Sequence, residues 1–164
     1  FQAFSGVIRE ARRRFVVVDT APTGHTMLLL DATGSYHRDV LRHSKMGTHI
    51  VTPMMRLRDP QQSRMLIVTL PETTPVLEAS ALQEDLRRAG IQPWAWVINS
   101  SLAAGAPTDP LLVRRAHAEV EQIEKVRTEM ADRVALVPWL PRQPVGAPTL
   151  RRLVGERGEV ARAG

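Results

Sequence analysis

Four short runs of apolar residues, separated by segments with helical periodicity, restrict the folds open to this chain of 164 residues. The runs occupy Phe15–Asp19, Arg64–Leu70, Pro93–Asn99 and Arg133–Pro138. Uninterrupted apolar runs of this length are typical of parallel strands that are buried on both faces. The alternation of strands and helices therefore predicts an α/β fold with a mostly parallel sheet flanked by helices.

The segments between these runs carry helix signals. A helix is expected over Pro75–Ala89, with Thr74 as its N-cap and Gly90 as its end. A longer helix is expected over residues 110–131, capped by Asp109. Shorter helices are expected at Phe4–Arg14, Thr26–Leu30, Tyr36–His43 and Thr149–Gly155.

The length fits one domain or a piece of a larger one, so residues 1–164 are expected to form part of a single domain. Within it, residues 45–62 have weak periodicity and are expected to be a mobile connection, and residues 156–164 a frayed tail. There is no cysteine, which excludes disulfides and thiolate metal sites from this chain and favours the cytosol. No apolar run approaches the length of a membrane-spanning helix.

The net charge of +5 raises the possibility of nucleic-acid binding. The arginines, however, stand among acidic residues on expected helices, and aromatic residues make up only 4% of the chain. No stacking platform or zinc-finger spacing accompanies them. The charge pattern therefore favours solvated helix faces, and no nucleic-acid partner is expected.

Polar residues follow the expected strands at their carboxyl ends, where parallel sheets bind ligands. These positions hold Asp19, the Pro71–Glu72 turn, Asn99 and Pro138. Asp19 is suited to hold a nucleotide's magnesium, or alternatively to cap the next turn. Asn99 offers both donor and acceptor to a base, or is a satisfied residue at a strand end. For Glu72, a turn role is slightly favoured over a nucleotide contact.

A loop with hydroxyls, a stiff proline and a glycine follows Asp19. Such a loop can sense a γ-phosphate and reorganise when that phosphate is lost. Its His25 could instead contact a nearby carbonyl at a helix start, and the other histidines are expected at the surface. The loop consists of Thr20, Ala21, Pro22, Thr23, Gly24, His25 and Thr26.

The eight residues from Asp19 to Thr26, DTAPTGHT, resemble the signature of the arsenite-transporting ATPases, within the larger anion-transporting ATPase family. The similarity continues through LLLDATGSYHRDV, TPMMRLRDP, VTLPETTPVLEA, IQPWAWVINSS and RVALVP, and covers nearly the whole chain. It implies the C-terminal portion of the second ATPase half. The implied fold is a partial P-loop NTPase fold, of the deviant Walker A or SIMIBI type, that lacks the P-loop strand.

The resemblance also implies cofactors and roles. ATP and Mg²⁺ would be bound by Asp19, Thr20, Asn99 and Pro138, with Asp19 holding Mg²⁺ through a water and Asn99 bonding adenine. The loop Asp19–Thr26 would be the switch, and His25 a ligand of allosteric As(III) or Sb(III). The implied function is MgATP hydrolysis driving metalloid efflux through a membrane arsenite efflux subunit. The implied location is the cytoplasm, peripheral to the inner membrane when bound to that pump.

Two departures from the family pattern limit these expectations. The chain has no G-x-x-x-x-G-K-[ST] phosphate-binding loop and none of the cysteines that soft metalloids prefer. A missing N-terminal half of the ATPase would explain both, so no catalytic residue is assigned here and the isolated chain is expected to be inactive.

Two alternatives remain open. The chain could be a fragment of an ATPase that targets tail-anchored membrane proteins, because flexible methionines suit promiscuous apolar surfaces. It could also be a nonfunctional remnant or an α/β module that binds partners. The methionines in question are Met46, Met54, Met55 and Met65.

Overall fold

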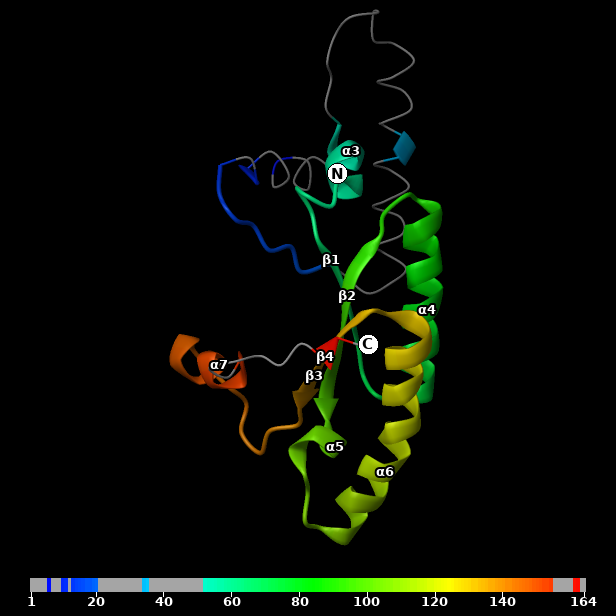
Figure 1. The fold of residues 1–164 in the computed structure, drawn as a ribbon. Coiled ribbons are helices and arrows are strands. Elements are labelled where there is room, and N and C mark those ends of the chain that lie inside the picture. Colours follow the sequence, from blue (N-terminus) through cyan, green and yellow to red (C-terminus); the bar gives the residue numbers. More distant parts are fainter. Residues whose placement is uncertain are drawn as a thin grey trace, which may run out of the picture. The chain divides into compact units, whose positions relative to one another are not determined.

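The protein is described here by a computed structural model, which defines residues 6, 10–11, 13–20, 34–35, 52–154 and 161–162. Strands and helices alternate along the main described segment, as the α/β prediction requires (Figure 1). The helices are α3 (Pro53–Arg58), α4 (Thr73–Arg88), α5 (Leu102–Gly105), α6 (Pro110–Lys125) with a π-helical turn (Val126–Met130), and α7 (Ala147–Val154). The strands are β1 (Met65–Thr69), β2 (Pro93–Ser101), β3 (Arg133–Pro138) and β4 (Ala161–Arg162).

The strands form one sheet in the order β1-β2-β3-β4. β2 and β3 pair in parallel, with Trp96 opposite Val134 and Ser101 opposite Pro138. β4 adds an antiparallel edge by pairing Val134 with Ala161. The prediction of a mostly parallel sheet flanked by helices is therefore confirmed.

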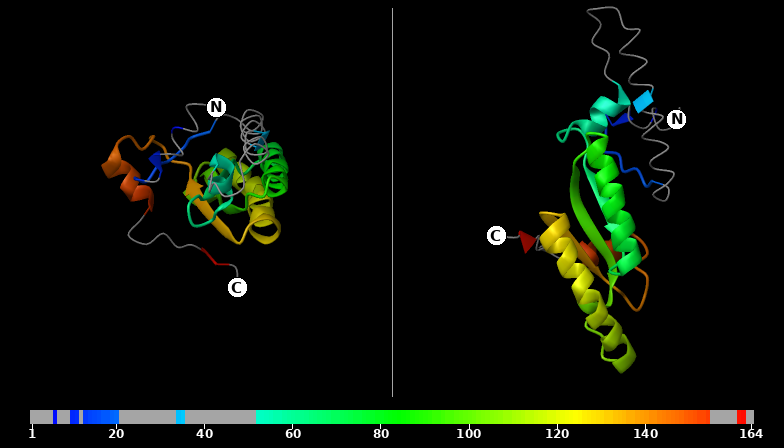
Figure 2. Two further views of the ribbon diagram at one scale, coloured as in Figure 1. Left: turned by 90° about the horizontal axis from the view of Figure 1, so that it is seen from above. Right: turned by 90° about the vertical axis from the view of Figure 1, so that its right-hand side faces the viewer.

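The two connections between the parallel strands place their helices on the same face of the sheet. Each connection crosses to the next strand in the same direction, and right-handed crossovers then stack α4 and α6 side by side. Figure 2 shows both helices on one side of the sheet and α7 on the other.

Helix boundaries follow local capping chemistry at most ends. Asp109 caps α6 as predicted, accepting hydrogen bonds from the backbone N–H groups of Leu111 and Leu112 at 2.9 and 3.2 Å. Gly90 follows the end of α4 with a φ of 78°, and the prediction that this glycine stops the helix is confirmed. The prediction that Thr74 caps α4 is wrong, because the helix already begins at Thr73 and its first turn is closed onto the Glu72 carbonyl.

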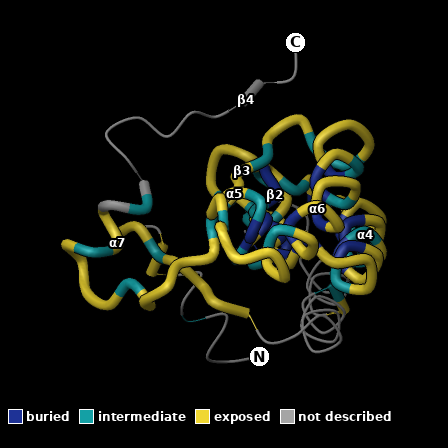
Figure 3. Tube along the Cα trace, turned by 90° about the horizontal axis from the view of Figure 1, so that it is seen from below, coloured by how far each residue is buried: buried dark blue, intermediate teal, exposed yellow. Residues whose placement is uncertain are grey.

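The buried core lies between the sheet and the helices that cover it (Figure 3). Trp96 and Ile98 of β2 are fully buried, and Trp96 Nε1 donates to Gln83 Oε1 of α4 at 2.7 Å. Gln83 in turn donates through Nε2 to the Met130 carbonyl at 3.0 Å. One buried amide thus links β2, α4 and the π-helical turn. Other buried apolar residues of this region are Ile67, Val76, Ala79, Ala95, Leu102, Ala116, Ile123 and Val126.

The chain divides into two compact units. One comprises Phe1–Met65 with Glu84–Gln92, and the other Leu66–Gln83 with Pro93–Gly164. In the first unit the Arg58 side chain donates through Nε to the Ala89 carbonyl at 2.7 Å. A positive charge is favourable at this place, because it lies at the C-terminal end of a helix. No helix among the residues that the structure describes is long and apolar enough to cross a membrane.

The prediction of a buried strand at Phe15–Asp19 is wrong for this structure. Residues 15–20 lie outside every strand, and the Phe15 side chain is 92% exposed. A β-branched run becomes a strand through pairing and packing rather than through its own backbone preference. Within the described ranges this run has no strand partner.

Several other predictions fall wholly or mainly outside the described residues. These are the helices at Thr26–Leu30 and Tyr36–His43 and most of the helix at Phe4–Arg14. The segment 45–62 is described from Thr52 onward, where it forms α3, and the tail 156–164 is described at β4.

Candidate functional site

The carboxyl ends of β2 and β3 form one edge of the sheet. The register places Ser101 opposite Pro138, and the Trp139 N–H donates to the Ser101 carbonyl at 2.8 Å. Asn99 lies two residues before Ser101 on the same strand. The structure therefore brings Asn99 and Pro138, two of the predicted cofactor-binding residues, to the same edge.

The backbone at this edge departs from regular strand geometry. The β2–β3 ladder is irregular between Ile98 and Ser101, and Ser100 has a φ of 57°. A non-glycine residue in this left-handed region is uncommon and needs support from its surroundings. The irregularity coincides with Asn99, whose side chain is exposed.

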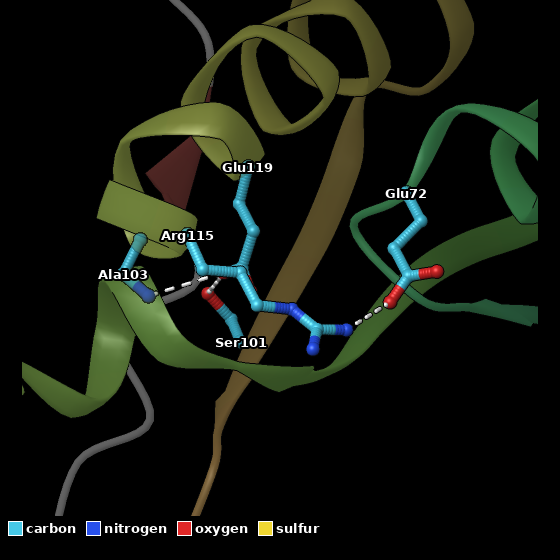
Figure 4. A network of polar contacts seen from close by, with 5 residues as sticks. All are labelled: Glu72, Ser101, Ala103, Arg115 and Glu119. Carbon is cyan, nitrogen blue, oxygen red and sulfur yellow. Dashed lines mark hydrogen bonds and ion pairs between the residues drawn. The ribbon is translucent and has the colours of Figure 1, made fainter. Parts of the chain in front are cut away.

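Ser101 is fully buried and lies at the centre of a hydrogen-bond network (Figure 4). Its Oγ donates to Glu119 Oε2 of α6 at 3.0 Å and accepts from the Ala104 N–H at 3.2 Å. The same Glu119 oxygen accepts from the Ala103 N–H at 3.1 Å. The buried carboxylate of Glu119 thus links α6 by hydrogen bonds to Ser101 and to the first turn of α5.

Glu72, in the turn after β1, pairs with Arg115 of α6 at 2.9 Å (Figure 4). Both side chains are about half exposed or more, so the pair is worth at most about 1 kcal/mol. The role of Glu72, in the turn or at the nucleotide, stays a prediction.

Trp139 begins the loop after Pro138, a loop that the resemblance to the arsenite-transporting ATPases implies would pack against the base. Its side chain is 57% exposed, directly after Pro138 at the end of β3. A Cβ on Gly105 would come within 3.1 Å of the Trp139 carbonyl, so a glycine allows α5 to approach this residue closely. An aromatic ring at this place in the loop can stack on a base.

Asp19 and Thr20 are exposed and lie outside the helices and strands. The rest of the predicted switch, Ala21–Thr26 with His25, lies outside the described residues. The magnesium, metalloid and switch assignments therefore stay predictions. His117 is exposed on α6, and the described ranges hold no group of three or more His, Asp or Glu side chains arranged to bind a metal.

Comparison with known proteins shows which proteins the whole chain resembles. No family model matches the chain. It is 60% identical over 156 residues to an arsenical pump-driving ATPase of Acidiphilium multivorum, covering 94% of the chain and 26% of that protein. It is 59% identical over 155 residues to an arsenical pump-driving ATPase of Escherichia coli, covering 94% of the chain and 27% of that protein. The predicted resemblance to the arsenite-transporting ATPases is thus confirmed, and the chain spans about a quarter of the length of the curated relatives it matches.

Proposed function

We propose that this chain supplies the adenine-binding edge and the magnesium-binding switch of an ATPase that drives an arsenical pump. The observation that carries the proposal is the pairing of the β2 and β3 ends, with an exposed Asn99 and an exposed Trp139, in a chain 60% identical to such ATPases.

The residues at this edge fit a purine base. The Asn99 side-chain amide is exposed and offers one donor and one acceptor, which matches the edge of adenine. Trp139 presents an aromatic surface beside Pro138, and base–aromatic stacking contributes about 1–3 kcal/mol. Asn99 would therefore select the base, and Trp139 would pack against it.

The phosphate end of the nucleotide is served only in part by this chain. Asp19 and Thr20 are exposed oxygen donors of the kind that Mg²⁺ prefers. No phosphate-binding loop with its lysine occurs in the 164 residues. MgATP, when bound, supplies the phosphoryl group that water receives, and this chain orients the base and the metal. The isolated chain is accordingly expected to have negligible ATPase activity.

The proposal extends to a metalloid ligand and a membrane subunit, which the resemblance to the arsenite-transporting ATPases implies. His25 is the candidate As(III) or Sb(III) ligand in the switch, with thiolates required from elsewhere because the chain has no cysteine. The partner would be a membrane arsenite efflux subunit, and the ATPase would work in the cytoplasm at the inner membrane.

The reading as a targeting factor for tail-anchored proteins loses part of its support. It relied on methionines at an apolar surface, but Met54 is 2% exposed and only Met55 of α3 is well exposed. Binding of a tail-anchor peptide, without any effect of As(III), would favour it nevertheless.

Photolabelling tests the proposal in the full-length polypeptide that carries this sequence. We expect 8-azido-ATP to label the tryptic peptide 134–142, which contains Trp139. In Asn99→Ala, about tenfold more ATP should be needed to block this labelling, because two base hydrogen bonds are lost. Gln92→Ala, which removes an exposed amide at the other end of β2, should change nothing. Equal ATP requirements in all three proteins would refute the assignment.

A further inference from the structure

The turn at the end of β2 has a backbone conformation that its surroundings must stabilise. Ser100 keeps a left-handed backbone with φ of 57° between the exposed Asn99 and the buried Ser101. Such a conformation persists only where the surrounding structure determines it, and it concentrates at functional sites. The support must come from the residues that bond to this turn.

The support converges on Glu119. Its Oε2 accepts from Ser101 Oγ at 3.0 Å and from the Ala103 N–H at 3.1 Å (Figure 4). Ser101 Oγ also accepts from the Ala104 N–H at 3.2 Å, so the hydroxyl links Glu119 to a second N–H group in the first turn of α5. The carboxylate therefore fixes the chain on the C-terminal side of Asn99.

Packing alone does not account for a carboxyl group at this position. Glu119 is 5% exposed, and burying a carboxylate costs free energy that hydrogen bonds must offset. Its neighbours on the same face of α6, Ala116 and Ile123, fill the core with apolar atoms instead. A carboxyl group here contributes what an alkyl group cannot, namely acceptors for the turn.

The same helix provides a matched contact without this role. Arg115, one turn before Glu119, pairs with Glu72 at the end of β1. Its side chain is 65% exposed, and it holds no strained backbone.

We propose that Glu119 is a positioning residue for base recognition, holding the Ser100–Ala103 turn so that the Asn99 amide faces the base in a fixed orientation. The inference rests on the proposed function, because it requires Asn99 to read adenine. It predicts that Glu119 governs the preference for adenine over guanine, since guanine reverses the donor and acceptor that the amide would meet.

The test compares the ATP and GTP concentrations that half-block 8-azido-ATP labelling of peptide 134–142 in the full-length polypeptide. Glu119→Ala should lower the GTP-to-ATP ratio by about tenfold, the loss expected for a misplaced hydrogen-bonding pair. Glu119→Gln keeps an acceptor oxygen and should restore most of the ratio. Arg115→Ala should leave it unchanged.

Gln83→Leu serves as the control for a general loss of stability, because it disrupts a different hydrogen-bond network in the same region. If Glu119→Ala merely weakens the fold, Gln83→Leu should lower the ratio equally, and the inference is overturned. A preserved ratio in both Glu119 variants also overturns it while leaving the proposed function intact. Absent labelling, or no adenine preference in the unmodified protein, would overturn both proposals together.

Discussion

The two faces of strand β1 carry similar residues but differ in exposure within the part of the chain that the structure describes. In β1, Ile67 and Thr69 are buried, whereas Leu66 and Val68, which alternate with them along the strand, are 49% and 62% exposed. All but Thr69 are apolar, so the amino-acid type does not explain the difference. The explanation is topological, because both right-handed crossovers send their helices to the same face.

This difference shows what a parallel sheet needs beyond apolar strands. In doubly wound folds, connections that cross the sheet in the opposite direction bring further crossover helices to the second face. The segment from β1 to β3 contains no such connection. The stability of the two faces should therefore respond unequally to substitution.

The largest effect is expected from Trp96→Ala on the covered face. Trp96 is fully buried and bonded to Gln83, so its removal leaves a cavity and an unpaired amide oxygen. We expect a loss of about 3–5 kcal/mol in the free energy of unfolding, measured by urea titration with circular dichroism. A loss below about 1 kcal/mol would mean that α4 does not close this face in solution.

Gln83→Leu should have the next largest effect. The substitution keeps a similar volume but leaves the buried Trp96 Nε1 and the partly buried Met130 carbonyl without their side-chain partner. We expect a loss of about 2 kcal/mol in the same urea titration, because unsatisfied buried groups retain their desolvation cost. Glu78→Gln, an exposed position of α4, serves as the control and should stay within about 0.5 kcal/mol.

Much of the covered face could be predicted from local signals. The bounds of β3 were predicted as Arg133–Pro138, and Asp109 was predicted to cap α6, because apolar runs and capping side chains act over a few residues. The run Phe15–Asp19 carries the same apolar signal and forms no strand. Its outcome depends on pairing partners, which a local pattern does not contain.

The candidate site divides in the same way. Asn99 and Pro138 could be placed at one edge because parallel strands bring their carboxyl ends together. Glu119 could not, because a carboxylate within a charged helix resembles a solvated residue until the helix is docked. Its burial against Ser101 is a property of tertiary packing alone.

The smallest effect is expected on the more exposed face of β1, from Val68→Thr. Threonine keeps the β-branched shape that favours a strand, and its hydroxyl would remain hydrated at a side chain that is 62% exposed. We expect a change within about 0.5 kcal/mol, whereas Ile67→Thr at the adjacent buried position should cost about 2 kcal/mol. Urea unfolding of both variants gives the comparison directly. Equal losses would show that a further layer covers the second face, and the contrast between the faces would then fail.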